Sequence, residues 1–316
     1  MSIKVFIDGA EGTTGLRLAD RLKDRKDIEL IKISQELRKD SAERANLANS
    51  ADIVFLCLPD AAAKEAVANI TNPNVKVIDP STAHRTDNDW VYGFPELSKF
   101  HRESVASAKR LSNPGCHASG FAALVYPIVS AGIAGADYPF ACHSLTGYSG
   151  AGRPMIEKYA DPNRNPVYAS PRQYALAQKH KHLPEMKKVS GLVHAPLFNP
   201  IIGDFYAGML VTVPIHTHML RKKYSAQDFH KYFSEFYAEQ KAVEVMPFGC
   251  ENDYIEGMID SEGLAGRDIM EIYVCGHEDQ VALISRFDNL GKGASGSAIQ
   301  CMNIMCGADE MTGLVL

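Results

Sequence analysis

One cysteine in the chain occupies a position suited to nucleophilic chemistry. Cys116 follows a Pro-Gly turn and opens a run of small and apolar residues from Ala118 to Ala136. If that run is a helix, Cys116 lies in its first turn, where backbone N–H groups have no intrahelical partner and the macrodipole favours an anion. A thiol placed there ionises more easily than an ordinary cysteine, and the thiolate is the nucleophile. The alternative is that Cys116 is a buried small hydrophobic residue, as most cysteines are.

A glycine-rich loop near the start of the chain has the composition of a dinucleotide site. The strand expected at Ile3–Ile7 is followed by Gly9, Gly12 and Gly15 and then by a helix-like segment, Leu16–Leu22. Glycines permit a tight turn and let the backbone approach a pyrophosphate at the helix N-terminus. The spacing is GxxGxxG rather than GxGxxG, so an ordinary strand-to-helix turn is the alternative.

The segment after the second expected strand bears on the choice of cofactor. Ile28–Ile33 ends at Ser34, where a site that prefers NAD usually offers a carboxylate to the ribose 2′-hydroxyl. Here a hydroxyl is followed by Arg38 and Lys39, which suit the 2′-phosphate of NADP, although Glu36 argues against that choice. A solvated helix start is the alternative for the two cations.

The order of the remaining elements predicts an α/β fold with two parts. Apolar runs alternate with helical segments in the first 115 residues, which indicates an open parallel sheet. The further strands expected there are Asp52–Pro59, Val75–Asp79 and Lys109–Ser112, with a helix at Ala61–Ile70. Ligands of such sheets bind at the carboxyl ends of the strands, and Cys116 follows the last of these strands.

The second half of the chain predicts a mainly antiparallel sheet with long loops. The strands expected there are Tyr138–Ser144, Gly208–Pro214, Glu271–Gly276 and Gln280–Ser285, with a basic helix around Lys222–Gln240 and a small-residue helix at Ser297–Met305. Pro184 is expected in the first turn of a short helix. No internal repeat or low-complexity segment is apparent.

Composition limits the class of protein. The chain has 316 residues, 46% hydrophobic and 22% charged, which is typical of a soluble globular protein of one large or two ordinary domains. The net charge of −5 gives no basic field for nucleic acid or anionic lipid. Seven cysteines without a CxxC pair indicate reduced thiols and a cytoplasmic protein rather than a disulfide framework or a zinc site.

Neither a signal peptide nor a membrane span is expected. The chain runs from Met1-Ser2 directly into a strand-like segment that contains Lys4 and Asp8. The uncharged stretch Leu111–Ala136 is diluted by alanine, glycine and proline, which favours a buried helix of a globular core.

Eight motifs together resemble the N-acetyl-γ-glutamyl-phosphate reductases of the short type. They occur in the family's order and cover almost the whole chain: GAEGTTG at 9–15, LPD at 58–60, DPSTAHR at 79–85, YGFPEL at 92–97, SNPGC at 112–116, GYSGAGR at 147–153, HKHLPEM at 180–186 and DNLGKGASGSAIQ at 288–300. The family is related to the aspartate-semialdehyde dehydrogenases. The resemblance implies an NADP-binding Rossmann-type domain made of residues 1–115 and 290–316, and an inserted α+β catalytic and oligomerisation domain at 116–289.

The resemblance implies NADPH-dependent reduction of N-acetylglutamyl phosphate to its semialdehyde through a cysteine thioester. Cys116 is then the nucleophile, with its own N–H and the Asn113 side chain as donors to the oxyanion. The step needs a proton shuttle near neutrality, which is expected at His182 and, second, His180. Glu185 of the same motif orients an imidazole or binds the acetamido group. These histidines are otherwise ordinary residues, and no further ligand cluster supports a metal at them.

Two arginines and a set of cofactor residues complete the implied site. Arg85 is expected to bind the departing phosphate and Arg153 the substrate α-carboxylate, the alternative being modest surface ion pairs. The cofactor residues implied by the motifs are Gly9, Gly12, Thr13, Thr14, Gly15, Ser34, Arg38, Pro59, Ser149 and Asn289.

Three questions stay open at the level of the sequence. His117 and Ser119 stand where the family often has an aromatic residue and a threonine, and no role is assigned to the extra imidazole. A related acyl-phosphate reductase, such as aspartate-semialdehyde dehydrogenase, and a non-catalytic NADP-binding protein are the alternative functions. A homo-oligomer, a dimer or tetramer, is expected from the family alone.

Overall fold

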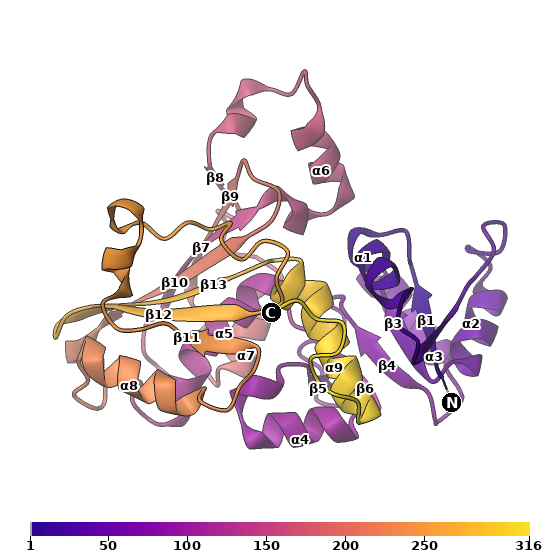
Figure 1. The fold of residues 1–316 in the computed structure, drawn as a ribbon, viewed down its shortest axis with the longest axis horizontal. Coiled ribbons are helices and arrows are strands. Elements are labelled where there is room, and N and C mark those ends of the chain that lie inside the picture. Colours follow the sequence, from indigo (N-terminus) through magenta and orange to yellow (C-terminus); the bar gives the residue numbers. More distant parts are fainter. Residues whose placement is uncertain (1) are drawn as a thin grey trace. The chain divides into compact units, whose positions relative to one another are not determined.

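Short apolar segments form a parallel sheet in the first part of the chain (Figure 1). The structure is a computed structural model, and it describes residues 2–316. The strands of this sheet are β1 (Ile3–Asp8), β2 (Ile28–Ile31), β3 (Ile53–Leu56), β4 (Lys76–Asp79), β5 (Val91–Tyr92) and β6 (Arg110–Ser112). Their order is β2-β1-β3-β4-β6-β5, and every pair is parallel, as the alternation of strands and helices predicts.

Helices cover both faces of the parallel sheet because its strands carry apolar residues on both faces. The helices of this part are α1 (Thr13–Leu22), α2 (Ser41–Ser50), α3 (Asp60–Asn69), α4 (Lys99–Ser107) and α9 (Gly296–Cys306). Val5 and Ile7 of β1 pack in one cluster with residues of α1, α4 and α9, whereas Phe6 packs in another with α2 and α3. The C-terminal helix α9 thus belongs to the core of the parallel-sheet unit.

The second sheet is mixed and mainly antiparallel. Its strands are β7 (Ala141–Gly147), β8 (Arg172–Gln173), β9 (Leu197–Gly203), β10 (Met209–His216), β11 (Val243–Val245), β12 (Met270–Gly276) and β13 (Gln280–Phe287). Their order is β11-β12-β13-β10-β7-β9-β8, with β7–β9 and β11–β12 parallel and the other pairs antiparallel. The helices of this part are α5 (Cys116–Ser130), α6 (Arg153–Ala160), α7 (Leu183–Val189) and α8 (Ala226–Phe236).

These two sheets lie in two compact units of the chain. The first contains the residues up to Pro114 together with Ala294–Leu314, and the second contains Gly115–Gly293 with Val315–Leu316. The predicted fold class, a Rossmann-type parallel sheet plus an α+β part with a mainly antiparallel sheet, is confirmed.

Helix α5 is buried against the second sheet, as its composition predicts, but it is shorter than the apolar run. A Cβ on Gly120 would lie 2.5 Å from Val211 Cγ2, so glycine is needed where the helix crosses β10. Pro127 lies inside α5 and cannot donate to the Ala123 carbonyl; the Tyr237 hydroxyl donates to that oxygen instead, at 2.8 Å. The helix ends at Ser130 because the chain turns through Gly132, whose φ is +64°.

Several element boundaries differ from those expected. Strand β7 starts at Ala141 rather than Tyr138, and α8 is confined to Ala226–Phe236, with Ser225 and Asp228 forming a capping box at its start. Strand β9 was not anticipated, because Asn199 and Pro200 interrupt its apolar pattern. Among the helices of residues 2–316, none combines the length and the apolar character needed to cross a membrane.

Candidate active site

Cys116 is the first residue of α5, and Gly115 is the N-cap. The helix start carries no side-chain cap and no acidic residue in its first turn, so the local field favours an anion at Cys116. The thiol is partly exposed. A Cβ on Gly293 would come within 3.0 Å of the Cys116 Cβ, so this glycine leaves space beside the thiol.

Glu185 of α7 binds the backbone just before the cysteine. Its Oε1 accepts a 2.8 Å hydrogen bond from the N–H of Gly115, and its side chain is buried, with 1% exposed. The distance in sequence is 70 residues. Glu185 therefore links α7 to the start of α5 and fixes the backbone that presents the thiol; its expected action on an imidazole or the acetamido group stays a prediction.

Three imidazoles gather beside Cys116. The ring of His117 lies 5.5 Å from that of His180 and 5.4 Å from that of His182, and the latter two rings are 4.7 Å apart, centroid to centroid. The His182 backbone N–H donates to His180 Nδ1 at 3.1 Å. His182 is the N-cap of α7, with Pro184 in the first turn as expected. The HxHxxE spacing thus brings both histidines and Glu185 to the cysteine's helix.

His117 lies deepest in this cluster. Its Nδ1 is 2.6 Å from the Ser144 hydroxyl on β7, and its Nε2 is 2.7 Å from the Tyr174 hydroxyl, in the residue that follows β8. Burial, reinforced by the positive charges of His180 and Lys181, lowers the pKa of His117 to about 3. Burial and the nearby Cys116 raise the pKa of Tyr174 above its ordinary value. Ser144 and Tyr174 were not anticipated, because neither lies in a recognisable motif.

The loop that carries Tyr174 and His180 has an unusual backbone. Ala175 and Gln178 adopt positive φ values of 52° and 55°. The Gln178 side chain donates to the Phe198 carbonyl and accepts from the Phe198 N–H, at 2.8 and 2.9 Å, which ties the loop to β9. Non-glycine residues in this region of φ cost about 1–3 kcal/mol each and are held only where the surroundings enforce them.

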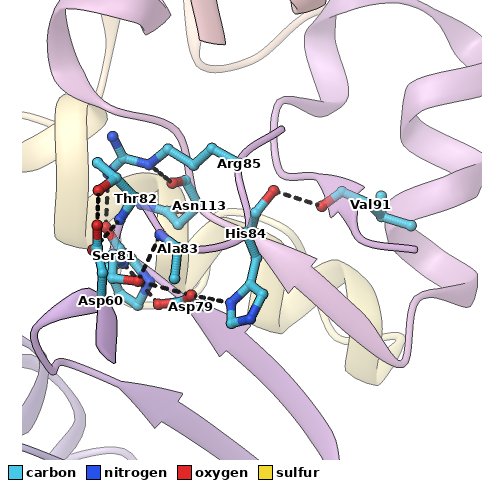
Figure 2. A network of polar contacts seen from close by, with 11 residues as sticks. Asp60, Asp79, Ser81, Thr82, Ala83, His84, Arg85, Val91 and Asn113 are labelled. Atoms are coloured by element: carbon cyan, nitrogen blue, oxygen red, sulfur yellow. Dashed lines mark hydrogen bonds and ion pairs between the residues drawn. The ribbon is translucent and has the colours of Figure 1, made fainter. Parts of the chain in front are cut away.

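The DPSTAHR segment forms a polar network in the parallel-sheet unit (Figure 2). Asp79, at the end of β4, accepts from the Ser81 N–H and hydroxyl and lies 2.6 Å from His84 Nδ1. Arg85 is 9% exposed; its Nε donates to the Asn113 carbonyl at 3.0 Å and its Nη2 to the Pro80 carbonyl at 2.7 Å. The network fixes both the segment and the guanidinium.

Asn113 follows β6 and is buried. Its Nδ2 donates to the Ala294 carbonyl at 3.0 Å, and its Oδ1 accepts from the Ser297 hydroxyl at 3.1 Å. One of its two amide protons is therefore used inside the first unit. The Asn113 side chain is therefore held in place by protein groups alone.

The glycine-rich loop fits a dinucleotide. A Cβ on Gly9 would lie 2.3 Å from the Cys57 carbonyl oxygen, and one on Gly15 would lie 2.4 Å from the Gly9 carbonyl oxygen. The space around Gly12, the N-cap of α1, is more open, at 3.5 Å or more. Helix α1, which begins at Thr13 and Thr14, has no side-chain cap and no acidic residue in its first turn. The amides at this end are available to a pyrophosphate.

One residue expected at the ribose lies next to that loop. Arg38 forms an ion pair with Glu11 of the glycine-rich loop. A hydrogen bond from its own backbone, and then one from the Ser34 hydroxyl, lower the pKa of Glu36. Pro59 is the N-cap of α3, at the carboxyl end of β3. The first unit thus brings Arg38 to the glycine-rich loop.

The other predicted residues lie in the second unit. The Asn289 Nδ2 donates to the Ser149 hydroxyl at 3.1 Å, and its Oδ1 accepts from the Gly208 N–H at 2.9 Å, which joins these two predicted cofactor residues. Arg153 lies at the exposed start of α6 and donates to Glu157 at 2.8 Å. It is not brought into the histidine cluster by any hydrogen bond or ion pair in residues 2–316.

Comparison with known proteins identifies the family. Residues 4–107 match the NAD binding domain of semialdehyde dehydrogenase, and residues 116–289 match its dimerisation domain. An N-acetyl-gamma-glutamyl-phosphate reductase 2 from a Nostoc species is 43% identical, over 98% of this chain and 99% of its own length. The corresponding reductase from Brucella ovis is 44% identical, over 97% of this chain and 100% of its own length.

Solved structures support the same fold. Aspartate semialdehyde dehydrogenase II from Vibrio cholerae is 16% identical and superimposes with a TM-score of 0.73, over 97% of this chain and 99% of its own. The aspartate semialdehyde dehydrogenase from Francisella tularensis gives a TM-score of 0.70 at 14% identity, over 96% of this chain and 100% of its own. At such identities the likeness concerns the fold. The relatives above 40% identity match over nearly the whole of both chains and carry the assignment further: the chain is an oxidoreductase of the N-acetyl-γ-glutamyl-phosphate reductase family.

Proposed function

We propose that the chain reduces N-acetyl-L-glutamyl 5-phosphate to N-acetyl-L-glutamate 5-semialdehyde with NADPH and releases phosphate, as a step of arginine biosynthesis. The observation that carries the proposal is the cluster of His117, His180 and His182 directly after Cys116 at the start of α5, in a chain over 40% identical to reductases of that name. Residues 1–115 with 290–316 are proposed as the NADP-binding domain. Residues 116–289 are proposed as the catalytic and homo-oligomerisation domain, in agreement with the dimerisation domain matched there.

In the proposed first step the Cys116 thiolate attacks the acyl carbon. A carbon–sulfur bond forms, the carbon–oxygen bond to phosphate breaks, and phosphate leaves with the electron pair, so the acyl group is held as a thioester. The N-terminal end of α5 stabilises the thiolate before the attack and the oxyanion that follows it. The reduced nicotinamide supplies the hydride that converts the thioester carbon to the aldehyde level. Cys116 then leaves as the thiolate and the aldehyde is released.

His182 is the better candidate for the acid/base. His180 Nδ1 accepts a hydrogen bond from the His182 backbone, so a neutral His180 carries its proton on Nε2 and offers no second lone pair. To accept a proton it has to give up that bond. His180 is therefore suited to donating a hydrogen bond, and His182 to taking the proton of the Cys116 thiol and returning it.

Arg85 and Asn113 are proposed to act at the phosphate and the oxyanion. Arg85 donates to two backbone carbonyls, which orients its planar guanidinium. Asn113 has its carbonyl and one amide proton anchored, so only the second amide proton remains for an oxyanion. Arg153 is proposed for the α-carboxylate, for which it must exchange its exposed partner Glu157.

NADP rather than NAD is proposed because of the segment after β2. Ser34 offers a hydroxyl and Arg38 a guanidinium, and the Arg38–Glu11 pair keeps that guanidinium beside the glycine-rich loop. A 2′-phosphate is a stronger partner for Arg38 than a single exposed carboxylate, because it carries more charge and several acceptor oxygens. Ser149 and Asn289 are proposed as further cofactor residues.

The test is a phosphate-dependent assay in the reverse direction. The full chain is supplied with NADP⁺, inorganic phosphate and a panel of semialdehydes. Reduction of NADP⁺ with N-acetylglutamate semialdehyde is expected, and Cys116→Ser should abolish it. Equal turnover of aspartate semialdehyde would refute the substrate, activity that survives in Cys116→Ser would refute the thioester, and a tenfold preference for NAD⁺ would refute the choice of cofactor.

A further inference from the structure

His117 lies between two hydroxyl groups, and the chemistry proposed above makes no use of it. Its Nδ1 is 2.6 Å from Ser144 Oγ and its Nε2 is 2.7 Å from the Tyr174 hydroxyl, with 3% of the residue exposed. Both ring nitrogens are thus engaged. A neutral imidazole has one N–H donor and one acceptor, so the hydrogen bonds on its two sides must run in the same direction.

The surroundings of His117 keep it neutral. The titratable groups that face it are the two histidines of the cluster, Lys181, Tyr174 and the adjacent Cys116. Phe198 packs on the ring from β9, at 5.2 Å between centroids. Burial and the neighbouring positive charges lower the pKa of His117 to about 3, far below neutrality. A cationic His117 would also have to donate to both hydroxyls.

Ser144 determines which way the hydrogen bonds run. Within residues 2–316, its hydroxyl has His117 as its only partner, and the residue is fully buried, with 0% exposed. If Ser144 donates to Nδ1, its proton is satisfied. If instead Nδ1–H donates to Ser144, the buried hydroxyl proton is left without an acceptor, which costs about 1–3 kcal/mol. The same loss falls on the Tyr174 proton in the Nε2–H tautomer, but Tyr174 is only partly buried, so its proton can reach solvent or a ligand. The Nε2–H tautomer of His117 is therefore favoured.

The tautomer of His117 determines where the Tyr174 hydroxyl proton can point. In the Nε2–H tautomer, His117 donates to the Tyr174 oxygen, so the phenolic proton has to point elsewhere. In the described part of the chain, His117 is the only hydrogen-bond partner of this hydroxyl. His117, which holds this hydroxyl at 2.7 Å, is the residue that follows Cys116 in α5, so the phenol lies at the start of the same helix. Burial, and then the nearby Cys116, raise the pKa of Tyr174, so the phenol stays protonated. The strained loop at Ala175 and Gln178 holds it there.

We propose that His117 is a positioning residue: it relays the direction of the Ser144 hydroxyl to Tyr174, and so leaves the Tyr174 proton as a hydrogen-bond donor to the reacting centre at Cys116. Tyr174 is the catalytic residue of this pair in the proposal, because its hydroxyl is held by the residue next to Cys116 and would donate to the oxygen of the bound acyl group. The role of the pair rests on the proposed function of the site. The tautomer of His117 does not.

The direct measurement is the tautomer of His117 in the full-length enzyme. Spectra of ¹⁵N-labelled imidazoles are recorded from pH 5 to 9, and the His117 signals are assigned among the eleven histidines by their loss in His117→Gln. A proton on Nε2 across the whole range is expected. A proton on Nδ1, or a transition to the cation within that range, overturns the relay whatever the substrate is.

A double-mutant cycle separates relaying from simple packing. Tyr174→Phe should lower kcat roughly 100-fold, the usual effect of losing one donor to an oxyanion. His117→Phe keeps a ring in the cavity and should lower kcat roughly 10- to 100-fold through a misdirected donor, with the KM for phosphate within about twofold. In the Tyr174→Phe background, His117→Phe should add less than about twofold. Independent, multiplying effects would overturn the relay, because a packing defect is felt with or without the phenol.

Ser144→Ala is the conservative control for direction. It keeps both His117 and Tyr174 but removes the hydroxyl that selects the tautomer, so some Nδ1–H form should appear in the spectra and kcat should fall severalfold. His117→Gln, whose amide can still donate to Tyr174, should retain more activity than His117→Phe. An unchanged tautomer in Ser144→Ala would overturn the assignment of direction. If only aspartate semialdehyde is turned over, the substrate proposal fails, while the spectra still decide the relay.

Discussion

Acidification should cost this protein stability through a single buried imidazole. His117 has a pKa of about 3 in the folded chain because it is buried beside His180 and Lys181, whereas an unfolded histidine has a pKa of about 6.5. Between these two values the unfolded chain binds a proton that the folded chain does not. The free energy of unfolding therefore falls as the pH is lowered through that window and is unaffected well above it.

The size of the effect follows from the two pKa values. In the window the slope approaches about 1.4 kcal/mol per pH unit, and between pH 7 and pH 4.5 the contribution of His117 sums to about 2.5 kcal/mol. This is a large share of the 5–15 kcal/mol by which domains are typically stable. His117→Gln carries no titrating group at this position. Its stability should therefore fall less than that of the wild type over the same range.

The assay is urea unfolding of the wild type and of His117→Gln at half-unit steps from pH 7 to pH 4.5. All other titrating groups are shared, so the difference between the two free energies isolates position 117. At pH 7 the variant is expected to be the less stable, because it fits the Ser144 and Tyr174 hydroxyls poorly, and the gap should close or reverse by about 2.5 kcal/mol on acidification. Parallel plots of the free energy of unfolding against pH would show that His117 binds a proton as easily in the folded chain as in the unfolded chain. A neutral His117 that relays hydrogen-bond direction would then be refuted.

Three further changes test the framework of the site. Gly9→Ala places a Cβ 2.3 Å from a backbone oxygen at a φ of +84°, so the loss of stability in thermal unfolding should be well above the roughly 1–3 kcal/mol of backbone strain alone. The control Gly132→Ala has a φ of +64° but open space around it and should lose only about 1 kcal/mol. Equal losses of stability in the two variants would count against the close-packed loop. Arg286 donates to the Glu271 carboxylate at 2.8 and 2.7 Å, so Glu271→Ala leaves it without a buried partner. The free energy of unfolding in urea should fall by about 3–5 kcal/mol. A fall below about 1 kcal/mol would contradict a buried ion pair. Glu185→Ala should lower the free energy of unfolding by about 1.5–3 kcal/mol and slow the alkylation of Cys116. Glu185→Gln keeps an acceptor for the Gly115 N–H, so it should retain most of the stability and most of the alkylation rate. Identical behaviour of the two variants would argue against the hydrogen bond.

The parallel sheet was readable from the sequence because local patterns determine it. Its strands are buried on both faces, so each is a nearly continuous apolar run, and each is followed by a helix with clear turn residues. The second sheet was less predictable. Strand β9 contains Asn199 and Pro200 and pairs with β7 in parallel through a connection of about 50 residues, so neither periodicity nor a tight turn marks it.

The site was readable only where chemistry and spacing coincide. Cys116 follows a Pro-Gly turn, and HxHxxE leads into one short helix, so the sequence predicts both as site residues. The hydrogen bond from Gly115 to Glu185 joins residues far apart in the sequence, and Ser144 is one of many serines. Such partners are selected by the folded backbone, and no local signal in the chain distinguishes them.

The direction of the hydrogen bonds distinguishes the roles of the three imidazoles better than the distances between the rings do. His117 receives from a buried serine and donates to a phenol, so it neither gains nor loses a proton. His180 receives from a backbone amide, so it is left as a donor. With a carboxylate at Gly115 and a neutral ring at 117, the neighbours of Cys116 in the chain supply it no positive charge. In the proposed mechanism the thiol proton therefore passes to His182, and the field that favours the thiolate comes from the start of α5.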